Sequence, residues 1–193
     1  MNIVGKSFCL VMSGKNYWRV RAGINGGVLQ HIDGYRKRVL KEPEKTLGVL
    51  NRGTDYAASK PPGHAVQATP EQVIEKIREL SKGEWSFKNI FVATEDAQAL
   101  EKMKTAFGNR VKYVDQKRFV LQKGEYIAGQ KEKDTWKPGD GWQYGADYLC
   151  AMVLLSGCGF FIASGSCTGT GLMQKLTPKG QQQSYIFDLG LYQ

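Results

Sequence analysis

Histidine, cysteine and long apolar runs are scarce in this sequence of 193 residues. Only His31 and His64 are present, and the four cysteines lack the spacing of metal ligands, which argues against a zinc site. The apolar run Phe8–Met12 is too short to span a membrane and is not followed by a signal-peptide cleavage site. We therefore expect a soluble, cytoplasmic protein with reduced thiols, no membrane span and no metal.

Acidic residues are also in the minority, since 27 lysines and arginines stand against 18 acids and give a formal net charge of +9. This excess suits an anionic partner, which could be a nucleic acid, a phosphorylated small molecule or an acidic surface. A nucleic-acid-binding domain that stacks bases on Tyr17, Trp18 and Trp136 ranks lowest, because the basic residues are dispersed along the chain.

A βαβ unit is predicted around a helix that starts at residue 70. Thr69 can cap this helix, Pro70 suits its first position, and Gln72 completes a capping box. Apolar residues then recur at helical spacing on one face. Short apolar runs at Thr46–Leu50 and Asn89–Thr94 flank the helix and are typical of buried strands.

The alternation of strands and helices continues to the end of the chain. Asp96 can cap a second helix, which ends before Gly108. The other expected elements are strands over 111–114, 159–163 and 185–188 and helices over 144–155 and near Leu172. Residues 116–142 are polar and are expected to form a long surface loop. In the region before residue 46 we expect a basic helix over 28–40 and two short strands over 8–12 and 17–21. We predict an α/β fold, a Rossmann-like three-layer domain with a mainly parallel sheet.

Small, polar or charged residues follow each expected strand. The strand ends are Asn51–Asp55, Thr94–Asp96, Asp115–Gln116 and Ser164–Thr170. Ligands of parallel sheets bind beyond the carboxyl ends of the strands, often against a helix amino terminus. Arg52 offers a planar fork of donors that matches phosphate, and Gly53, Gly165 and Gly169 permit close approach of the backbone. These residues favour an anion site, although neither a P-loop nor a GxGxxG spacing is present.

A purely structural interpretation of the same residues remains open. Strand ends carry turn residues in every α/β protein. Thr94 and Asp96 would then only cap a helix, and Arg52 would only pair with Asp55 or Glu95.

The first strand and the residues after it resemble a known motif. Leu47–Tyr56 reads Leu-Gly-Val-Leu-Asn-Arg-Gly-Thr-Asp-Tyr. It is similar to the apolar strand and His-x-Arg-x-Thr-Asp that open the nucleotide-sugar-binding domain of fucosyltransferase-like glycosyltransferases. The likeness runs from about Tyr35 to Gln193, with an unfamiliar stretch near 122–140, and is to bacterial members found in surface-polysaccharide synthesis. Further similar segments are Pro62–Gln67, Thr69–Ile74, Phe91–Asp96, Tyr148–Cys158, Phe160–Thr170 and Phe187–Tyr192.

The resemblance implies a GT-B fold, in which two Rossmann-like domains face a cleft and the second binds the donor. Residues 46–193 would be this C-terminal, nucleotide-sugar-binding domain, and residues 1–45 an N-terminal extension or a remnant of the acceptor-side domain. The resemblance implies metal-independent, inverting transfer of a sugar from a nucleotide-sugar to a glycan or polysaccharide acceptor. GDP-fucose is the first candidate for the donor.

The resemblance also assigns roles to residues of three strand ends. The implied contacts to the nucleotide-sugar are Arg52, Gly53, Thr54, Asp55, Thr94, Glu95, Asp96, Ser164, Ser166, Cys167 and Thr168. Arg52 would stabilise negative charge on the departing diphosphate, which in a water-excluded site is worth several kcal/mol. His64 lies in a loop that could reach the cleft and is the candidate for acid–base catalysis.

Two positions and the length depart from the family pattern. Leu50 stands where many members have histidine, and Gly159 where many have an aspartate that recognises guanine, which leaves the base of the donor open. Residues 1–45 are too few for an acceptor-binding domain of roughly a hundred residues, so a second chain or a homo-oligomer would supply the acceptor side. The alternative is a non-catalytic nucleotide-binding or protein-interaction module of the same ancestry.

Overall fold

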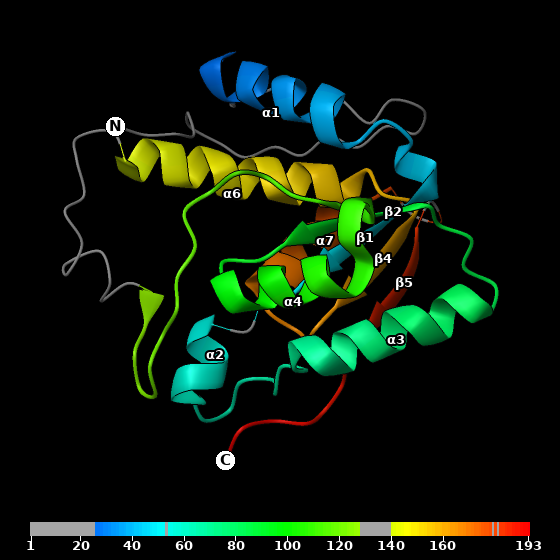
Figure 1. Ribbon diagram of the computed structural model, residues 1–193. Helices are drawn as coiled ribbons and strands as arrows, with labels where there is room; N and C mark the ends of the chain where they lie inside the picture. Colours follow the sequence, from blue (N-terminus) through cyan, green and yellow to red (C-terminus); the bar gives the residue numbers. More distant parts are fainter. Residues whose placement is uncertain (1–25, 53, 128–139, 179, 181) are drawn as a thin grey trace.

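The structure is a computed structural model that describes residues 26–52, 54–127, 140–178, 180 and 182–193. The strands expected over 8–12 and 17–21 lie outside these residues. The described part of the chain forms an α/β domain around one parallel sheet (Figure 1).

The sheet has five parallel strands in the order β3-β2-β1-β4-β5. The strands are β1 (Thr46–Leu50), β2 (Asn89–Ala93), β3 (Val111–Lys112), β4 (Phe160–Ala163) and β5 (Gln183–Ile186). β1 lies at the centre and all of its residues are buried, as expected for an apolar strand that is covered on both faces. The prediction of an α/β fold with a mainly parallel sheet is confirmed.

Helices cover both faces of the sheet and give the domain three layers (Figure 1). The face with Leu50 and Phe91 packs against α6 and α7, and α1 packs on α6. The opposite face, with Val49 and Val92, packs against α3 and α4. The helices are α1 (Gly26–Val39), α2 (Thr54–Ser59), α3 (Pro70–Lys82), α4 (Ala97–Phe107), α6 (Asp140–Ser156) and α7 (Thr168–Leu176), with short 3₁₀ helices η1 (Pro43–Lys45) and η2 (Gly108–Arg110).

The caps predicted for the two helices after β1 and β2 are confirmed. The hydroxyl of Thr69 accepts from the backbone N–H of Gln72, and the Gln72 side chain accepts from the backbone of Thr69. The carboxylate of Asp96 accepts from the N–H groups of Gln98 and Ala99 at the start of α4. These local hydrogen bonds begin both helices at the sheet edge where β1 and β2 end.

Several predicted boundaries differ in the structure by two to four residues; among the strands, β3 ends at Lys112 and β5 begins at Gln183. α6 begins at Asp140, so the last part of the predicted surface loop over 116–142 belongs to this helix. The helix tolerates Gly141 in its first turn because Asp140 stabilises the amino end and the buried residues that follow anchor the rest. The expected helix over 28–40 is α1, whose Val28 and Ile32 are buried against α6. Residues 26–45 thus pack on the domain, and their separation from it as an extension stays a prediction.

None of the described helices is long and apolar enough to cross a membrane. The described cysteines Cys150, Cys158 and Cys167 are free thiols.

Candidate functional site

The carboxyl ends of β1, β2 and β4 bring many of the predicted site residues together at one edge of the sheet. They line a small cavity between the strand ends and α6. Its polar lining includes the predicted residues Arg52, Thr94, Glu95 and Cys167. The cavity measures about 20 Å³, which is room for one water-sized group.

Arg52 follows β1 and is held by two neighbours from α2. Its guanidinium Nη2 lies 3.7 Å from Oδ2 of Asp55, and its Cζ lies 4.9 Å from the centroid of the Tyr56 ring. Burial opposes the charge of Arg52, but Asp55 and other negative groups nearby outweigh it and raise its pKa above the ordinary value. The Nε atom is buried and has no hydrogen-bond partner in the described part of the chain. Arg52 is therefore a fixed cation with a donor still free.

Asn51 lies beside Arg52 and is more deeply buried, with 1% of the residue exposed. Its backbone N–H donates to the Ala93 carbonyl over 3.1 Å, which extends the β1–β2 pairing by one residue. Its side chain lines the cavity, and neither Nδ2 nor Oδ1 has a hydrogen-bond partner among the residues that the structure describes. The strand-end pattern included Asn51 but gave it no role.

Two tyrosines of α6 form the other wall of the site. The Tyr144 hydroxyl donates a hydrogen bond to the Glu95 carboxylate. Burial, with Glu95 nearby, raises the pKa of Tyr144, and burial raises that of Tyr148. Neither residue was predicted as part of the site. The available signal was their spacing with Met152 at i, i+4 and i+8, which places all three on one face of the helix.

The turn after β4 contributes less to the cavity than predicted. The Ser164 hydroxyl is buried, accepts from the backbone N–H of Arg52 over 3.0 Å and donates to Oε1 of Gln67 over 2.9 Å. Ser166 and Thr168 are exposed, and Cys167 is half-buried at the start of α7. The Ser164 hydroxyl is thus engaged within the protein, whereas Cys167 lines the cavity.

The glycines of this turn make room for the protein itself. A Cβ on Gly165 would lie 2.7 Å from Nε2 of Gln67, and a Cβ on Gly169 would lie 3.2 Å from Cδ2 of Leu50. Both glycines are thus required by packing inside the turn, and Gly169 also lines the cavity. Their role in close approach to a ligand stays a prediction. Gly53 lies outside the described residues.

The residues predicted after β2 have capping roles as well. The Thr94 hydroxyl accepts from the backbone N–H of Asp96, and Asp96 caps α4. This much of the structural interpretation is correct. Thr94 and Glu95 also line the cavity, and Gln116 joins them by donating from Nε2 to the Thr94 carbonyl over 3.4 Å.

His64 is exposed and lies one side chain away from Arg52. Its ring meets the Tyr56 ring edge to face, with 5.5 Å between the centroids, and Tyr56 in turn lies under Arg52. Its Nδ1 is 3.2 Å from the Pro62 carbonyl. The structure therefore brings His64 near the predicted site without placing it in the cavity.

The two departures from the family pattern have different positions. Leu50 ends β1 and lines the cavity. Gly159 precedes β4 and lies next to the start of β1, at the opposite edge of the sheet from Arg52. A Cβ at Gly159 would overlap the carbonyl group of Glu44. Gly159 is thus required by packing, and the expectation that it replaces a guanine-recognising aspartate stays a prediction.

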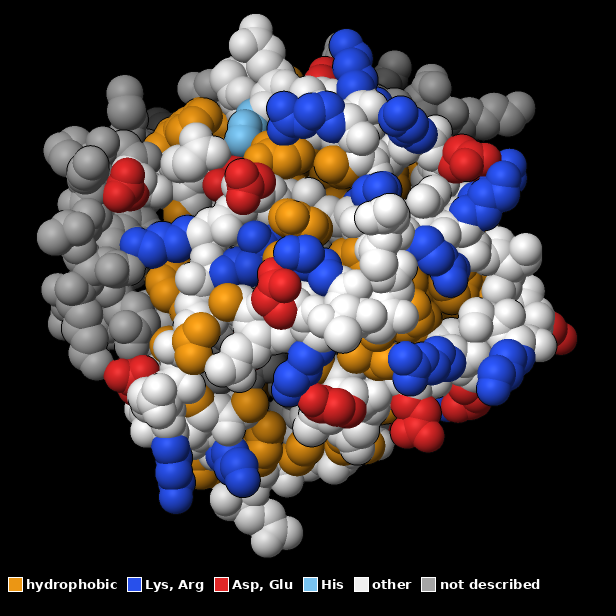
Figure 2. All heavy atoms as spheres, viewed as in Figure 1, with side chains coloured by type: hydrophobic (Ala, Val, Ile, Leu, Met, Phe, Trp, Pro, Cys, Tyr) orange, Lys and Arg blue, Asp and Glu red, His pale blue; other side chains and the backbone are white. Residues whose placement is uncertain are grey.

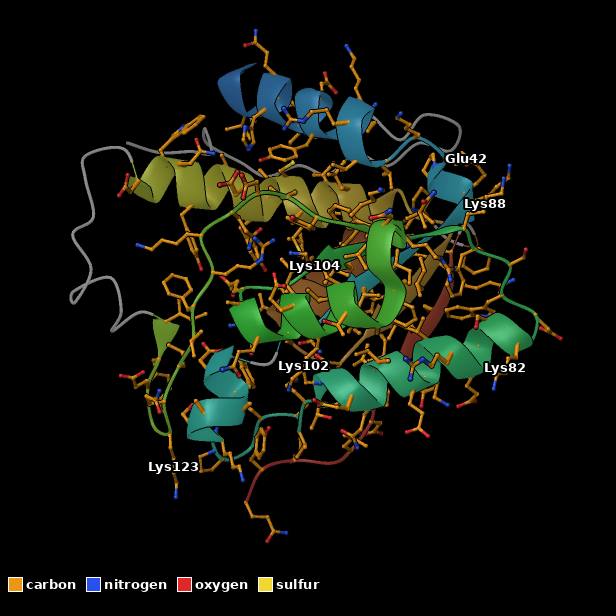
Figure 3. The ribbon with its side chains drawn as sticks, viewed as in Figure 1. Glu42, Lys82, Lys88, Lys102, Lys104 and Lys123 are labelled. Atoms are coloured by element: carbon orange, nitrogen blue, oxygen red, sulfur yellow. The ribbon has the colours of Figure 1, made fainter. Side chains whose placement is uncertain are left out.

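The described residues contain no group of three His, Cys, Asp or Glu side chains that could hold a metal ion. On the face of the molecule shown in Figure 2, lysines and arginines are dispersed with acidic residues between them. The lysines labelled in Figure 3 come from several elements, and Lys102 and Lys104 of α4 pair with Glu71 and Glu101 at 2.7 and 2.8 Å. Such paired, interspersed charges are typical of a solvated surface and do not favour a nucleic-acid groove.

Comparison with known proteins finds similarity in structure alone. No protein-family model matches the sequence, and neither does any curated protein. The fucosyltransferase NodZ from Bradyrhizobium matches with a TM-score of 0.53 and 20% identity, over 81% of this chain and 43% of its own. NodZ alpha-1,6-fucosyltransferase soaked with GDP-fucose matches with a TM-score of 0.55 and 20% identity, over 86% and 46%.

A second fucosyltransferase-like structure agrees. POFUT1 in complex with GDP-fucose matches with a TM-score of 0.52 and 12% identity, over 85% of this chain and 46% of its own. The described domain therefore shares its fold with part of these fucosyltransferase-like GT-B structures, as the motif after β1 predicted, and the chain spans less than half of their length.

Proposed function

We propose that this chain is the nucleotide-sugar-binding domain of a metal-independent, inverting glycosyltransferase, with GDP-fucose as its donor. The observation that carries the proposal is Arg52, a half-buried cation after the central strand whose buried Nε–H has no acceptor among the described residues. A diphosphate would supply the acceptor that this donor lacks and a charge to match the guanidinium. NodZ and POFUT1, which share the fold, bind GDP or GDP-fucose.

The chemistry follows from the charge of the leaving group. The acceptor hydroxyl attacks the anomeric carbon, the bond from that carbon to the diphosphate oxygen breaks, and the hydroxyl proton passes to a base. The departing nucleoside diphosphate gains negative charge, which Arg52 would stabilise. His64 is our candidate for the base, because its ring contacts the Tyr56 ring, over which the Arg52 guanidinium lies.

The test is a thermal-shift titration with GDP, UDP, ADP and GDP-fucose on the wild type and Arg52→Ala. A ligand at a hundred times its Kd should stabilise the wild type by about 2.7 kcal/mol, a rise of several degrees in Tm. The shift should disappear in Arg52→Ala. Arg78→Ala, which removes an exposed arginine from α3, is the matched control and should keep the wild-type shift.

The outcomes separate four cases. A shift with GDP and GDP-fucose alone supports the proposed donor, and a shift with UDP or ADP alone changes its base. A shift that survives in Arg52→Ala contradicts the role of Arg52. No shift in the wild type with any of the four contradicts the proposal.

A non-catalytic module of the same ancestry is the second candidate, and the size of the cavity favours it. Ligand pockets usually enclose roughly 300 Å³ or more, whereas the cavity at the strand ends measures about 20 Å³. A nucleotide would therefore lie mainly against the outer side of the site or would require Tyr144 and Tyr148 to move. Sugar transfer to any acceptor would exclude this candidate.

Three further expectations belong to the proposal. The acceptor would be a bacterial surface polysaccharide or another glycan, a second chain or a second copy would supply the acceptor side, and the protein would act in the cytoplasm. Mixing the chain with candidate partner domains and measuring transfer from GDP-fucose would test the first two.

A further inference from the structure

Asn51 is a buried polar side chain of the site whose amide has no hydrogen-bond partner among the described residues. The residue is 1% exposed, lines the cavity, and has no hydrogen-bond partner for Nδ2 or Oδ1 within the described part of the chain. Its position is fixed, because the backbone N–H donates to Ala93 and the preceding strand is buried throughout. The groups without hydrogen-bond partners are therefore the two polar atoms of the Asn51 side chain.

An apolar residue of the same size would suit this environment better. A buried amide without partners loses its hydrogen bonds to water and gains none in exchange. Leu50 and Ala93 already provide apolar lining, so packing does not require an amide at position 51. A ligand group that bonds to the amide would account for it.

The chemistry of the amide narrows down this ligand group. A carboxamide donates from Nδ2 and accepts at Oδ1. A phosphate oxygen could only accept, from Nδ2 and from the free Nε of Arg52, and would leave Oδ1 unmet. A hydroxyl group both donates and accepts and satisfies both ends of the amide. The cavity of about 20 Å³ admits one such group and not a nucleobase ring.

We infer that Asn51 is a specificity-determining residue that binds a hydroxyl group of the nucleotide-sugar, from either the ribose or the transferred sugar. This inference rests on the proposed function. It adds a contact to a part of the donor other than the diphosphate, and through this contact the site would select its donor. Arg52 binds the anion, and Asn51 distinguishes ligands that carry the hydroxyl from those that lack it.

The experiment compares the wild type with Asn51→Leu, Asn51→Asp and the control Asn109→Leu, which changes an exposed residue at η2. Calorimetric titrations use GDP, 2′,3′-dideoxy-GDP, GDP-fucose and inorganic pyrophosphate. Asn51→Leu should bind the hydroxyl-bearing ligand roughly tenfold more weakly and should bind pyrophosphate as the wild type does. Its Tm should be equal to that of the wild type or higher, because an unsatisfied amide has been removed.

The ligands distinguish the two sources of the hydroxyl. If the ribose supplies it, dideoxy-GDP binds the wild type more weakly than GDP does, and this difference vanishes in Asn51→Leu. If the sugar supplies it, GDP binds both proteins equally and only GDP-fucose loses affinity. Either result supports the inference.

Asn51→Asp keeps the shape of the side chain and provides a check if the leucine variant folds poorly. Its carboxylate can accept from a hydroxyl but repels phosphate. Asn51→Asp should keep more of the GDP or GDP-fucose affinity than of the pyrophosphate affinity. Equal losses for all ligands would assign Asn51 to the phosphate and overturn the inference.

Two other results would also overturn it. Wild-type affinity for both GDP and GDP-fucose in Asn51→Leu, while Arg52→Ala abolishes binding, would refute the role of Asn51 and leave the proposed function intact. A wild type that binds none of these ligands would refute both.

Discussion

The two edges of the sheet differ in how well their polar groups are satisfied. At the amino edge, where the strands begin, the protein bonds its own groups: the N–H of Gly159 donates to the Pro43 carbonyl over 2.8 Å, and the Thr46 hydroxyl donates to the Glu42 carbonyl over 2.7 Å. Nε2 of Gln182 donates to the Cys158 carbonyl over 2.8 Å. This edge is closed by packing and hydrogen bonds.

The carboxyl edge is built differently. Both amide atoms of Asn51 and Nε of Arg52 are buried there without partners in the described part of the chain. The strand that precedes both residues, β1, is paired with β2 and β4 over most of its length. The difference therefore concerns side chains: among the described residues, the amino edge pairs its polar groups and the carboxyl edge leaves three buried polar atoms without partners.

Thiol chemistry should show the largest difference between the edges. Cys158 is 3% exposed near the amino edge, and burial raises its pKa, so its thiolate fraction at pH 8 is below that of an ordinary thiol. Cys167 is half-buried at the carboxyl edge and lines the cavity. Iodoacetamide should alkylate Cys167 at least roughly a hundredfold faster than Cys158, measured for each peptide by mass spectrometry.

Cys150 extends this test to α6. Burial raises the pKa of its thiol to about 12, so it should react as slowly as Cys158. Unfolding in urea should bring the three rates together. Similar rates for Cys158 and Cys167 in the folded protein would show that the amino edge opens as easily as the carboxyl edge.

Substitution of Gly159 tests the closed edge directly. A Cβ there would overlap the Glu44 carbonyl, which is backbone and cannot rotate away. Gly159→Ala should therefore lower the free energy of unfolding by about 3 kcal/mol, measured by urea denaturation. Gly34→Ala is the control, because nothing lies within 4 Å of its Cβ and it is within α1; it should stabilise by about 0.5–1 kcal/mol. Wild-type stability of Gly159→Ala would mean that this edge has room to adjust.

Much of this fold could be predicted from local sequence signals. The Thr69 capping box and the Asp96 cap depend on residues within three positions of each other, and both are present in the structure. β1 is buried over its whole length and was therefore visible as an apolar run. The strand ends could be placed together because parallel strands bring their carboxyl ends to one edge.

The contacts across the site could not be predicted in the same way. Tyr144 meets Glu95, and Ser164 meets Gln67, through sequence separations of 49 and 97 residues. The packing role of Gly159 could not be predicted either, because only the fold shows that the Glu44 carbonyl occupies the space beside it. Likewise, a sequence cannot show that the Asn51 amide lacks partners, since this depends on every neighbour at once.

Two serines of the turn after β4 provide the smallest and most selective test of the comparison. Ser164 bonds the backbone of Arg52 and the side chain of Gln67, whereas Ser166 is exposed. Ser164→Ala would leave a buried N–H and a buried carbonyl oxygen unpaired and should destabilise by about 2 kcal/mol. Ser166→Ala should change stability by less than about 0.5 kcal/mol.

The same pair separates support of Arg52 from contact with a ligand. If Ser164 acts by holding the Arg52 backbone, Ser164→Ala should lower both Tm and GDP affinity, whereas Ser166→Ala should lower affinity alone if its hydroxyl binds phosphate. Thermal denaturation and calorimetric titration of both variants measure the two effects. An unchanged Tm for Ser164→Ala would mean that the Ser164 hydroxyl is available to a ligand. The carboxyl edge would then offer a ligand more hydrogen-bonding groups than those of Asn51 and Arg52.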